Sequence, residues 1–151
     1  MAAWAEAGGC AKKTGSAGAQ AMKSVCLSLR VDLPNGSRLG PGKIALLESV
    51  RERRSIAAAA RDHDMSYRRA WLLIDDLNRA FAEPVVATFP GRSQGAGAAL
   101  TPFGERLIGI YREAEQRARA AAGSLLADIG DACGHEYIPS GVIRKRRSDR
   151  G

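Results

Sequence analysis

Two helical segments joined by a very short turn are the feature that most restricts the fold of this chain. Ser55 precedes a short helix over 56–62, and Ser66 precedes a second amphipathic stretch; serine is a favoured residue at a helix N-cap. The polar segment 63–65 interrupts the helical pattern between them. Alanines in the first helix are small enough for the second helix to cross closely over it. These features predict a helix-turn-helix unit.

The second of these helices, over residues 66–81, is predicted to have one apolar side and one basic side. At 100° per residue, Arg68 and Arg69 point away from the apolar stripe, while Tyr67 and Trp71 lie on its flank. Guanidinium groups at the start of a helix can pair with guanine edges in the major groove of DNA. The apolar stripe itself recurs at helical spacing and consists of Ala70, Leu73, Ile74, Leu77 and Phe81.

A strand and a helix are predicted before this unit. Alternating apolar residues over 25–32 indicate a strand, and a turn follows through Pro34, Asn35 and Gly36. A helix is expected to begin at Pro41, because proline suits the first helical position, and to run to about residue 54.

A hairpin and a long helix are predicted after the unit. Segments 85–90 and 98–100 have strand character, and the loop between them contains several glycines and Arg92, which is typical of a wing. Thr101 is the expected N-cap of a last helix that runs to about residue 129. So long an apolar face favours packing against a second copy of the chain. The residues expected at that interface are Leu107, Ile110, Ala114, Ala118, Ala121 and Leu125.

The predicted fold class is therefore mainly α with a small β wing, an α+β winged helix-turn-helix. We expect residues 1–23 to be a disordered tail and 24–130 to form the domain, with a dimerisation helix over about 101–129. Residues 131–151 are expected to be a second, basic and disordered tail.

Charge supports an anionic partner, although only in part. The formal net charge is +7 and the pI is about 9.8, a balance that favours nucleic acid. Much of the excess lies in the two tails, and the central region is close to neutral. The placement of particular arginines therefore decides whether the domain itself can bind DNA.

Other classes of protein are disfavoured by the sequence. The three cysteines, Cys10, Cys26 and Cys133, show no paired spacing, so neither a disulfide framework nor a zinc site is expected. His63 is expected to be a turn residue. Neither histidine lies in a nucleophile or metal pattern, so we expect no enzyme, metal or cofactor. Without a signal peptide or a membrane-spanning run, a cytoplasmic protein with no membrane partner is expected.

The ordered part of the chain resembles the N-terminal DNA-binding domain of the ModE family, the molybdenum-dependent transcriptional regulators. The segments LGPGKIALLESV (39–50), SIAAAARDHDMSYRRAWLLIDDLN (55–78) and LTPFGERLIGIY (100–111) carry the resemblance, with the glycine-rich loop before the last. It covers residues of about 25–129. Regulators of the LysR type have a similar helix-turn-helix and are the nearest neighbours.

The resemblance implies a homodimer that binds double-stranded DNA at palindromic operators. It implies that the second helix contacts DNA through Ser66, Tyr67, Arg68, Arg69 and Trp71, and the wing through Arg92, Ser93 and Gly95. Full-length family members usually carry C-terminal molybdate-binding modules, and residues 131–151 are too few for one. Direct molybdate binding is therefore not expected.

The sequence thus predicts a bacterial-type, sequence-specific DNA-binding transcriptional regulator. Two alternatives remain open. A winged helix can bind a protein instead of DNA, and the near-neutral domain leaves room for that. A non-specific DNA-binding protein could rely on the basic tails alone. Arginines on both the second helix and the wing favour DNA binding over a protein partner, and deletion of both tails would separate non-specific from sequence-specific DNA binding.

Overall fold

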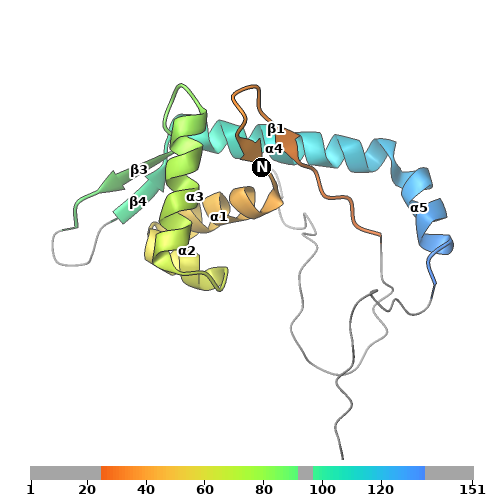
Figure 1. Cartoon of the computed structure of the whole chain (residues 1–151), viewed down its shortest axis with the longest axis horizontal. Coiled ribbons are helices and arrows are strands. Elements are labelled where there is room, and N and C mark those ends of the chain that lie inside the picture. The colour runs from red at the N-terminus through yellow and green to blue at the C-terminus, as the bar shows by residue number, and fades with distance from the viewer. Residues whose placement is uncertain (1–24, 92–96, 135–151) are drawn as a thin grey trace, which may run out of the picture. The chain divides into compact units, whose positions relative to one another are not determined.

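The computed structural model describes residues 25–91 and 97–134, and it divides the chain into two units. One unit is residues 27–122, and the other contains the described residues on either side of it. The first unit consists of β1 (Val31–Asp32), β2 (Arg38–Leu39), α1 (Pro41–Arg53), α2 (Ile56–Asp62), α3 (Tyr67–Ala80), β3 (Val86–Phe89), β4 (Gly97–Leu100) and α4 (Pro102–Ala121) (Figure 1). Helix α5 (Gly123–Asp131) belongs to the second unit. The described residues are mostly helical, with two small antiparallel strand pairs, which agrees with the predicted α+β class.

Serine side chains mark where α2 and α3 begin, and proline at the first helical position marks the start of α1. The Ser55 hydroxyl accepts a hydrogen bond from the Ala58 amide (3.3 Å), and the Ser66 hydroxyl accepts one from the Arg69 amide (3.2 Å). Each serine satisfies an amide that has no partner within its own helix. The predicted starts of α2 and α3 are thereby confirmed, as is the start of α1 at Pro41.

The core lies where α1, α2 and α3 meet. Ala59 and Ala60 of α2 are fully buried, as is Ala70 of α3, so three methyl-sized side chains separate these helices. The predicted apolar stripe of α3 is confirmed at Ile74 and Leu77, which are buried, while Leu73 and Phe81 are half-buried at its edges. Helix α1 contributes Ile44, Leu46, Leu47 and Val50, and α4 contributes Leu107, Ile108 and Tyr111.

The predicted strand over 25–32 is wrong for most of its length. Only Val31–Asp32 pairs, with Arg38–Leu39, because the chain enters α1 immediately afterwards and offers no longer partner. The apolar alternation in the sequence nevertheless corresponds to an alternation in the burial of the side chains. Leu27 and Leu29 are half-buried, and the residues between and after them are exposed. The segment is extended chain lying along the core rather than part of a sheet.

A β-hairpin follows α3, close to where one was predicted. Strands β3 and β4 are antiparallel, with Val86 opposite Leu100 and Phe89 opposite Gly97. The hairpin extends beside α3 in Figure 1. Because the hairpin begins within a few residues of the end of α3, its strands are held close to that helix.

The prediction of one helix from 101 to 129 is wrong, because the helix is interrupted. Helix α4 ends at Ala121, and α5 starts at Gly123. The amide of Ala122 still donates to the Ala118 carbonyl (3.0 Å), so α4 completes its last turn before the break. Glycine at 123 favours the interruption, since it lowers helix stability by about 1 kcal/mol relative to alanine.

Helix α4 is anchored to α1 by a partly buried ion network. The Arg112 guanidinium donates to both carboxylate oxygens of Glu48 (2.8 and 2.6 Å) and to Glu115 (2.8 Å). Glu115 is only 5% exposed, and it also accepts from Arg119 (3.0 Å). The hydrogen bonds from Arg112 to Glu48 raise the pKa of Arg112. A bidentate pair of this kind fixes orientation as well as distance.

Tyr111 ties the same helix to the extended segment. Its hydroxyl donates to the Leu29 carbonyl (2.6 Å), and burial raises the pKa of this phenol.

Within the described ranges, no helix combines the length and the apolar character needed to cross a bilayer.

Gly104 in the first turn of α4 permits an unusually close approach of two backbones. A Cβ at this position would lie 2.3 Å from the Val85 carbonyl oxygen, whereas a Cβ at Gly109 would meet nothing within 4 Å. Gly104→Ala is therefore expected to lower the free energy of unfolding by about 1–3 kcal/mol through overpacking. Gly109→Ala is the matched control, expected to raise it by about 0.5–1 kcal/mol. Urea unfolding of both variants tests this, and equal effects would contradict the close approach.

Candidate nucleic-acid interface

The N-terminal half of α3 presents its polar and aromatic side chains to solvent. Ser66, Arg68 and Arg69 are exposed, and Tyr67 and Trp71 are 53% and 43% exposed. The structure therefore brings all five residues predicted on the second helix together at the start of α3, and it leaves each of them exposed beside the buried stripe. Large aromatic rings left this exposed indicate a surface that is available to a partner.

Unpaired positive charge is concentrated in one part of the described chain. Among the described residues, each lysine and arginine has a carboxylate within 4 Å except four, which are Arg54, Arg61, Arg68 and Arg69. All four side chains are exposed, and they lie at the end of α1, on α2 and at the start of α3. These guanidinium groups retain their hydrogen-bonding capacity for an anion from outside the chain.

The neighbouring carboxylates are already engaged by other cations. Asp62 accepts two hydrogen bonds from Arg53 (2.7 and 3.1 Å), and this interaction lowers the pKa of Asp62. Asp75 pairs with Arg79 (3.0 Å), and Asp76 pairs with Lys43. The acidic pair on α3 is thus partly neutralised, which reduces the repulsion of phosphate that its sequence position suggests.

The Asn78 side chain connects α3 to the hairpin. Its carbonyl oxygen accepts from the amides of Val85 (2.8 Å) and Val86 (3.0 Å), and its amide donates to the Val86 carbonyl (3.0 Å). One side chain thereby satisfies three backbone groups, and this fixes the hairpin relative to the exposed face of α3. Sequence reasoning missed Asn78, whose only signal was an amide residue near the end of a helix that precedes a strand.

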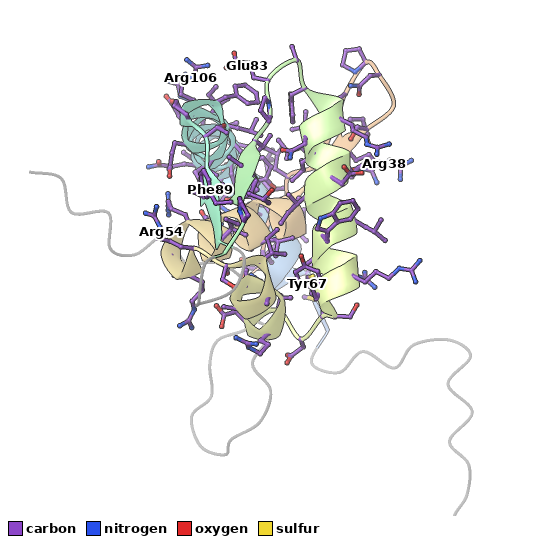
Figure 2. All side chains as sticks on the ribbon, turned by 90° about the vertical axis from the view of Figure 1, so that its left-hand side faces the viewer. Arg38, Arg54, Tyr67, Glu83, Phe89 and Arg106 are labelled. Carbon is purple, nitrogen blue, oxygen red and sulfur yellow. The ribbon has the colours of Figure 1, made fainter. Side chains whose placement is uncertain are left out.

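Arg54 connects the hairpin to α1 on the other side. Its carbonyl accepts from the Ala98 amide of β4 (3.0 Å). Phe89, at the end of β3, is largely exposed, and Figure 2 shows it on the same face of the domain as Tyr67. Sequence reasoning singled out neither Arg54 nor Phe89. The predicted wing residues Arg92, Ser93 and Gly95 lie outside the described residues.

A shallow depression of about 350 Å³ adjoins Arg69. Its walls come from α1, α3 and the β1–β2 segment, and they combine cationic groups with apolar ones. Arg30 and Arg38 both pair with Asp32, so this pair of arginines carries more positive charge than its carboxylate neutralises. The lining residues are Arg30, Arg38, Gly40, Gly42, Lys43, Met65, Arg69 and Leu73.

His63 lies in the turn after α2, as predicted, and is held there by α1. Its Nε2 atom is 2.8 Å from the Ser49 hydroxyl and 3.2 Å from the Ala45 carbonyl oxygen. Both contacts are with α1, so this histidine anchors the turn between α2 and α3. No group of three potential metal ligands occurs in the part of the chain that the structure describes.

The residues predicted for dimerisation are not on one continuous helix. Leu107 is 7% exposed and is already packed in the core of its own domain. Ile110 is 65% exposed, and Ala114 and Ala121 of α4 are also exposed, while Ala118 is half-buried. Leu125 is 63% exposed and belongs to α5, in the other unit. The exposed members remain candidates for an interface.

Fold and surface together define a small α+β protein whose α2–α3 region presents unpaired arginines. No protein-family model matches the chain. Its relatives include the molybdenum-pterin-binding protein MopB of Rhodobacter capsulatus, 45% identical over 76 residues, which are 50% of this chain and 28% of MopB. The molybdenum transport protein ModE of Azotobacter vinelandii is 33% identical over 106 residues, 70% of this chain and 39% of that protein.

A third relative is the DNA-binding transcriptional dual regulator ModE of Escherichia coli. It is 37% identical over 71 residues, 47% of this chain and 27% of the regulator. The matched segments thus span well under half of each relative. These likenesses support a relationship to the ModE family, and the three relatives are named as regulators, transport proteins or molybdenum-pterin-binding proteins rather than enzymes.

Proposed function

We propose that this chain is a sequence-specific DNA-binding transcriptional regulator of the ModE type. In this proposal α2 and α3 form a helix-turn-helix, and β3 and β4 form a wing. The observation that carries it is the exposure of Arg68 and Arg69 at the start of α3, where neither has a carboxylate partner among the described residues. The naming of a relative as a DNA-binding regulator supports the same conclusion.

The proposed mechanism is recognition in the major groove, with no bond made or broken. The start of α3 enters the groove, where one arginine pairs in two places with guanine and the other holds phosphate. A bidentate pair with guanine discriminates against the wrong base by about 1–3 kcal/mol. Ser66 adds a phosphate contact at the start of the helix, and Tyr67 and Trp71 supply contact area.

The wing completes the proposed contact surface. Arg92, Ser93 and Gly95 would meet the backbone or the minor groove beside the α3 contacts. The Asn78 hydrogen bonds to Val85 and Val86 support this arrangement, because they hold the start of the hairpin beside α3. A hairpin that starts beside the recognition helix can meet the same duplex as that helix.

Two other functions predict different behaviour. A protein-binding module would use the exposed apolar side chains Tyr67, Trp71 and Phe89, and it would not need unpaired arginines beside them. A non-specific DNA-binding protein would depend on charge alone, so its affinity would be equal for all sequences. Selection from a pool of random DNA duplexes distinguishes both alternatives from the proposal.

Selection from a pool of random duplexes, followed by binding assays on the enriched site, tests the proposal. The wild type is expected to enrich a palindromic motif. Arg68→Ala/Arg69→Ala is expected to lose preference for that motif by tenfold or more, as expected from losing one base pairing of about 1–3 kcal/mol together with a phosphate contact. Arg79→Ala, which removes an exposed but ion-paired arginine of the same helix, is the control.

Three outcomes separate the alternatives. Enrichment of a motif that the double variant no longer prefers supports base reading by α3. Binding that is equal for all sequences and unchanged in the double variant points to the basic tails. Absence of binding to any duplex overturns the proposal and favours a protein partner.

We also propose that the chain acts as a homodimer through the exposed apolar residues of α4, Ile110 foremost. Ile110→Glu is expected to shift the protein from dimer to monomer, since it places a charge in the proposed apolar interface. The fold should persist, because this side chain is 65% exposed in the single chain. Sedimentation equilibrium gives the mass, with Gln116→Glu, about 120° around α4, as control. A wild type that is already monomeric at micromolar concentration would rule out the dimer.

Direct binding of molybdate is not part of the proposed function. That expectation comes from the sequence and stays a prediction, since one relative is named a molybdenum-pterin-binding protein. Calorimetric titration of the protein with sodium molybdate is expected to give no saturable heat. A saturable signal with defined stoichiometry would contradict the prediction and make this chain itself the sensor.

A further inference from the structure

Arg54 occupies a backbone conformation that normally favours glycine. It is the C-cap of α1, with φ 53° and ψ 27° in the left-handed region, where the Cβ of an L-residue is crowded. The cap itself is made by the backbone, because the Arg54 amide donates to the Val50 carbonyl (2.8 Å). Glycine would form the same cap without the crowding. The arginine side chain therefore contributes nothing to this cap that glycine could not supply.

The same residue is fixed in space from both sides. Besides capping α1, its carbonyl accepts the Ala98 amide of β4 (3.0 Å). Its side chain is exposed and has no carboxylate partner among the described residues. Figure 2 shows Arg54 at the edge of the domain, beside the hairpin and apart from Tyr67. A strained, anchored residue with an unpaired cationic side chain is the kind of outlier that suggests a functional contact.

Arg61 lies in the last turn of α2 and has the same electrostatic character. The adjacent carboxylate of Asp62 is hydrogen-bonded to Arg53, and Arg61 forms no ion pair with it within 4 Å. On the same side of the helix, four residues earlier, stands Ala57, whose small side chain lets another backbone approach closely. Helix α2 spans about 10 Å between its ends. Arg54 and Arg61 thus lie near the two ends of α2.

We propose that Arg54 and Arg61 contact backbone phosphates of the duplex along α2, while α3 reads its bases. The inference rests on the proposed function and adds two contacts outside α3 and the wing. The ligand is the phosphodiester backbone, so these contacts carry no sequence preference. They set the depth and angle at which α3 enters the groove, because Arg54 is also fixed to the hairpin.

The test measures DNA affinity at several salt concentrations together with thermal unfolding. Each lost phosphate contact lowers the slope of log affinity against log salt by about 0.9. The ratio of affinities at 50 and 200 mM salt should therefore fall about 3.5-fold in Arg54→Gly and again in Arg61→Ala. Enriched and random duplexes should be affected equally. Arg54→Gly should also raise the unfolding temperature, because glycine relieves the left-handed strain.

Two matched variants complete the design. Arg54→Lys keeps the positive charge and is expected to retain most of the salt slope. Arg106→Ala removes an arginine that pairs with Glu83, away from α2, and is expected to keep the wild-type slope. In Arg54→Gly, DNA affinity is expected to fall while the unfolding temperature rises. Loss of folding would lower both, so it cannot produce this combination.

The outcomes distinguish this inference from the function on which it rests. Lower slopes in Arg54→Gly and Arg61→Ala, with Arg106→Ala unchanged, support it. If the wild type binds and Arg68→Ala/Arg69→Ala loses preference, but the α2 variants behave like Arg106→Ala, the inference is wrong and the proposed function stands. If the wild type binds no duplex, both are wrong.

Discussion

The close packing of α2 and α3 against α1 is the constraint on which the rest of the structure depends. Ala59, Ala60 and Ala70 are buried at the crossing, and a larger side chain at any of them would force the helices apart. Because these helices lie so close, the turn through His63 can be short and the start of α3 is left at the surface. The exposed arginines of α3 are a consequence of this packing.

Side-chain hydrogen bonds then attach the hairpin to the helices. Asn78 satisfies three backbone groups at the start of β3, and the Arg54 carbonyl satisfies one on β4. The first turn of α4 approaches Val85 so closely that only glycine fits at position 104. Hairpin, α3 and α4 are therefore fixed relative to one another by specific contacts. A surface built from several elements can act as one unit only if they are held in this way.

The capacity of this protein to bind an anion depends on which cations are paired with carboxylates, and less on its net charge. The central region is close to neutral in sequence, which by itself weakens a case for DNA binding. In the structure most of its cations are neutralised by nearby carboxylates, as Arg53 is by Asp62. Among the described residues, the few cations without a carboxylate within 4 Å lie close together in sequence, at the end of α1, on α2 and at the start of α3. A small excess of charge is thereby left as unpaired cations on and next to the two helices that are proposed to meet DNA.

The sequence by itself determined the local elements, because their causes are local. The caps Ser55 and Ser66, and the apolar spacing of α3, depend on neighbours within a turn or two, and these predictions were confirmed. Only the tertiary structure decided which strands find partners and which arginines remain unpaired. Asn78 and Arg54 were missed for the same reason. Their contacts join separate elements, and no spacing along a chain reveals which distant groups folding will bring together.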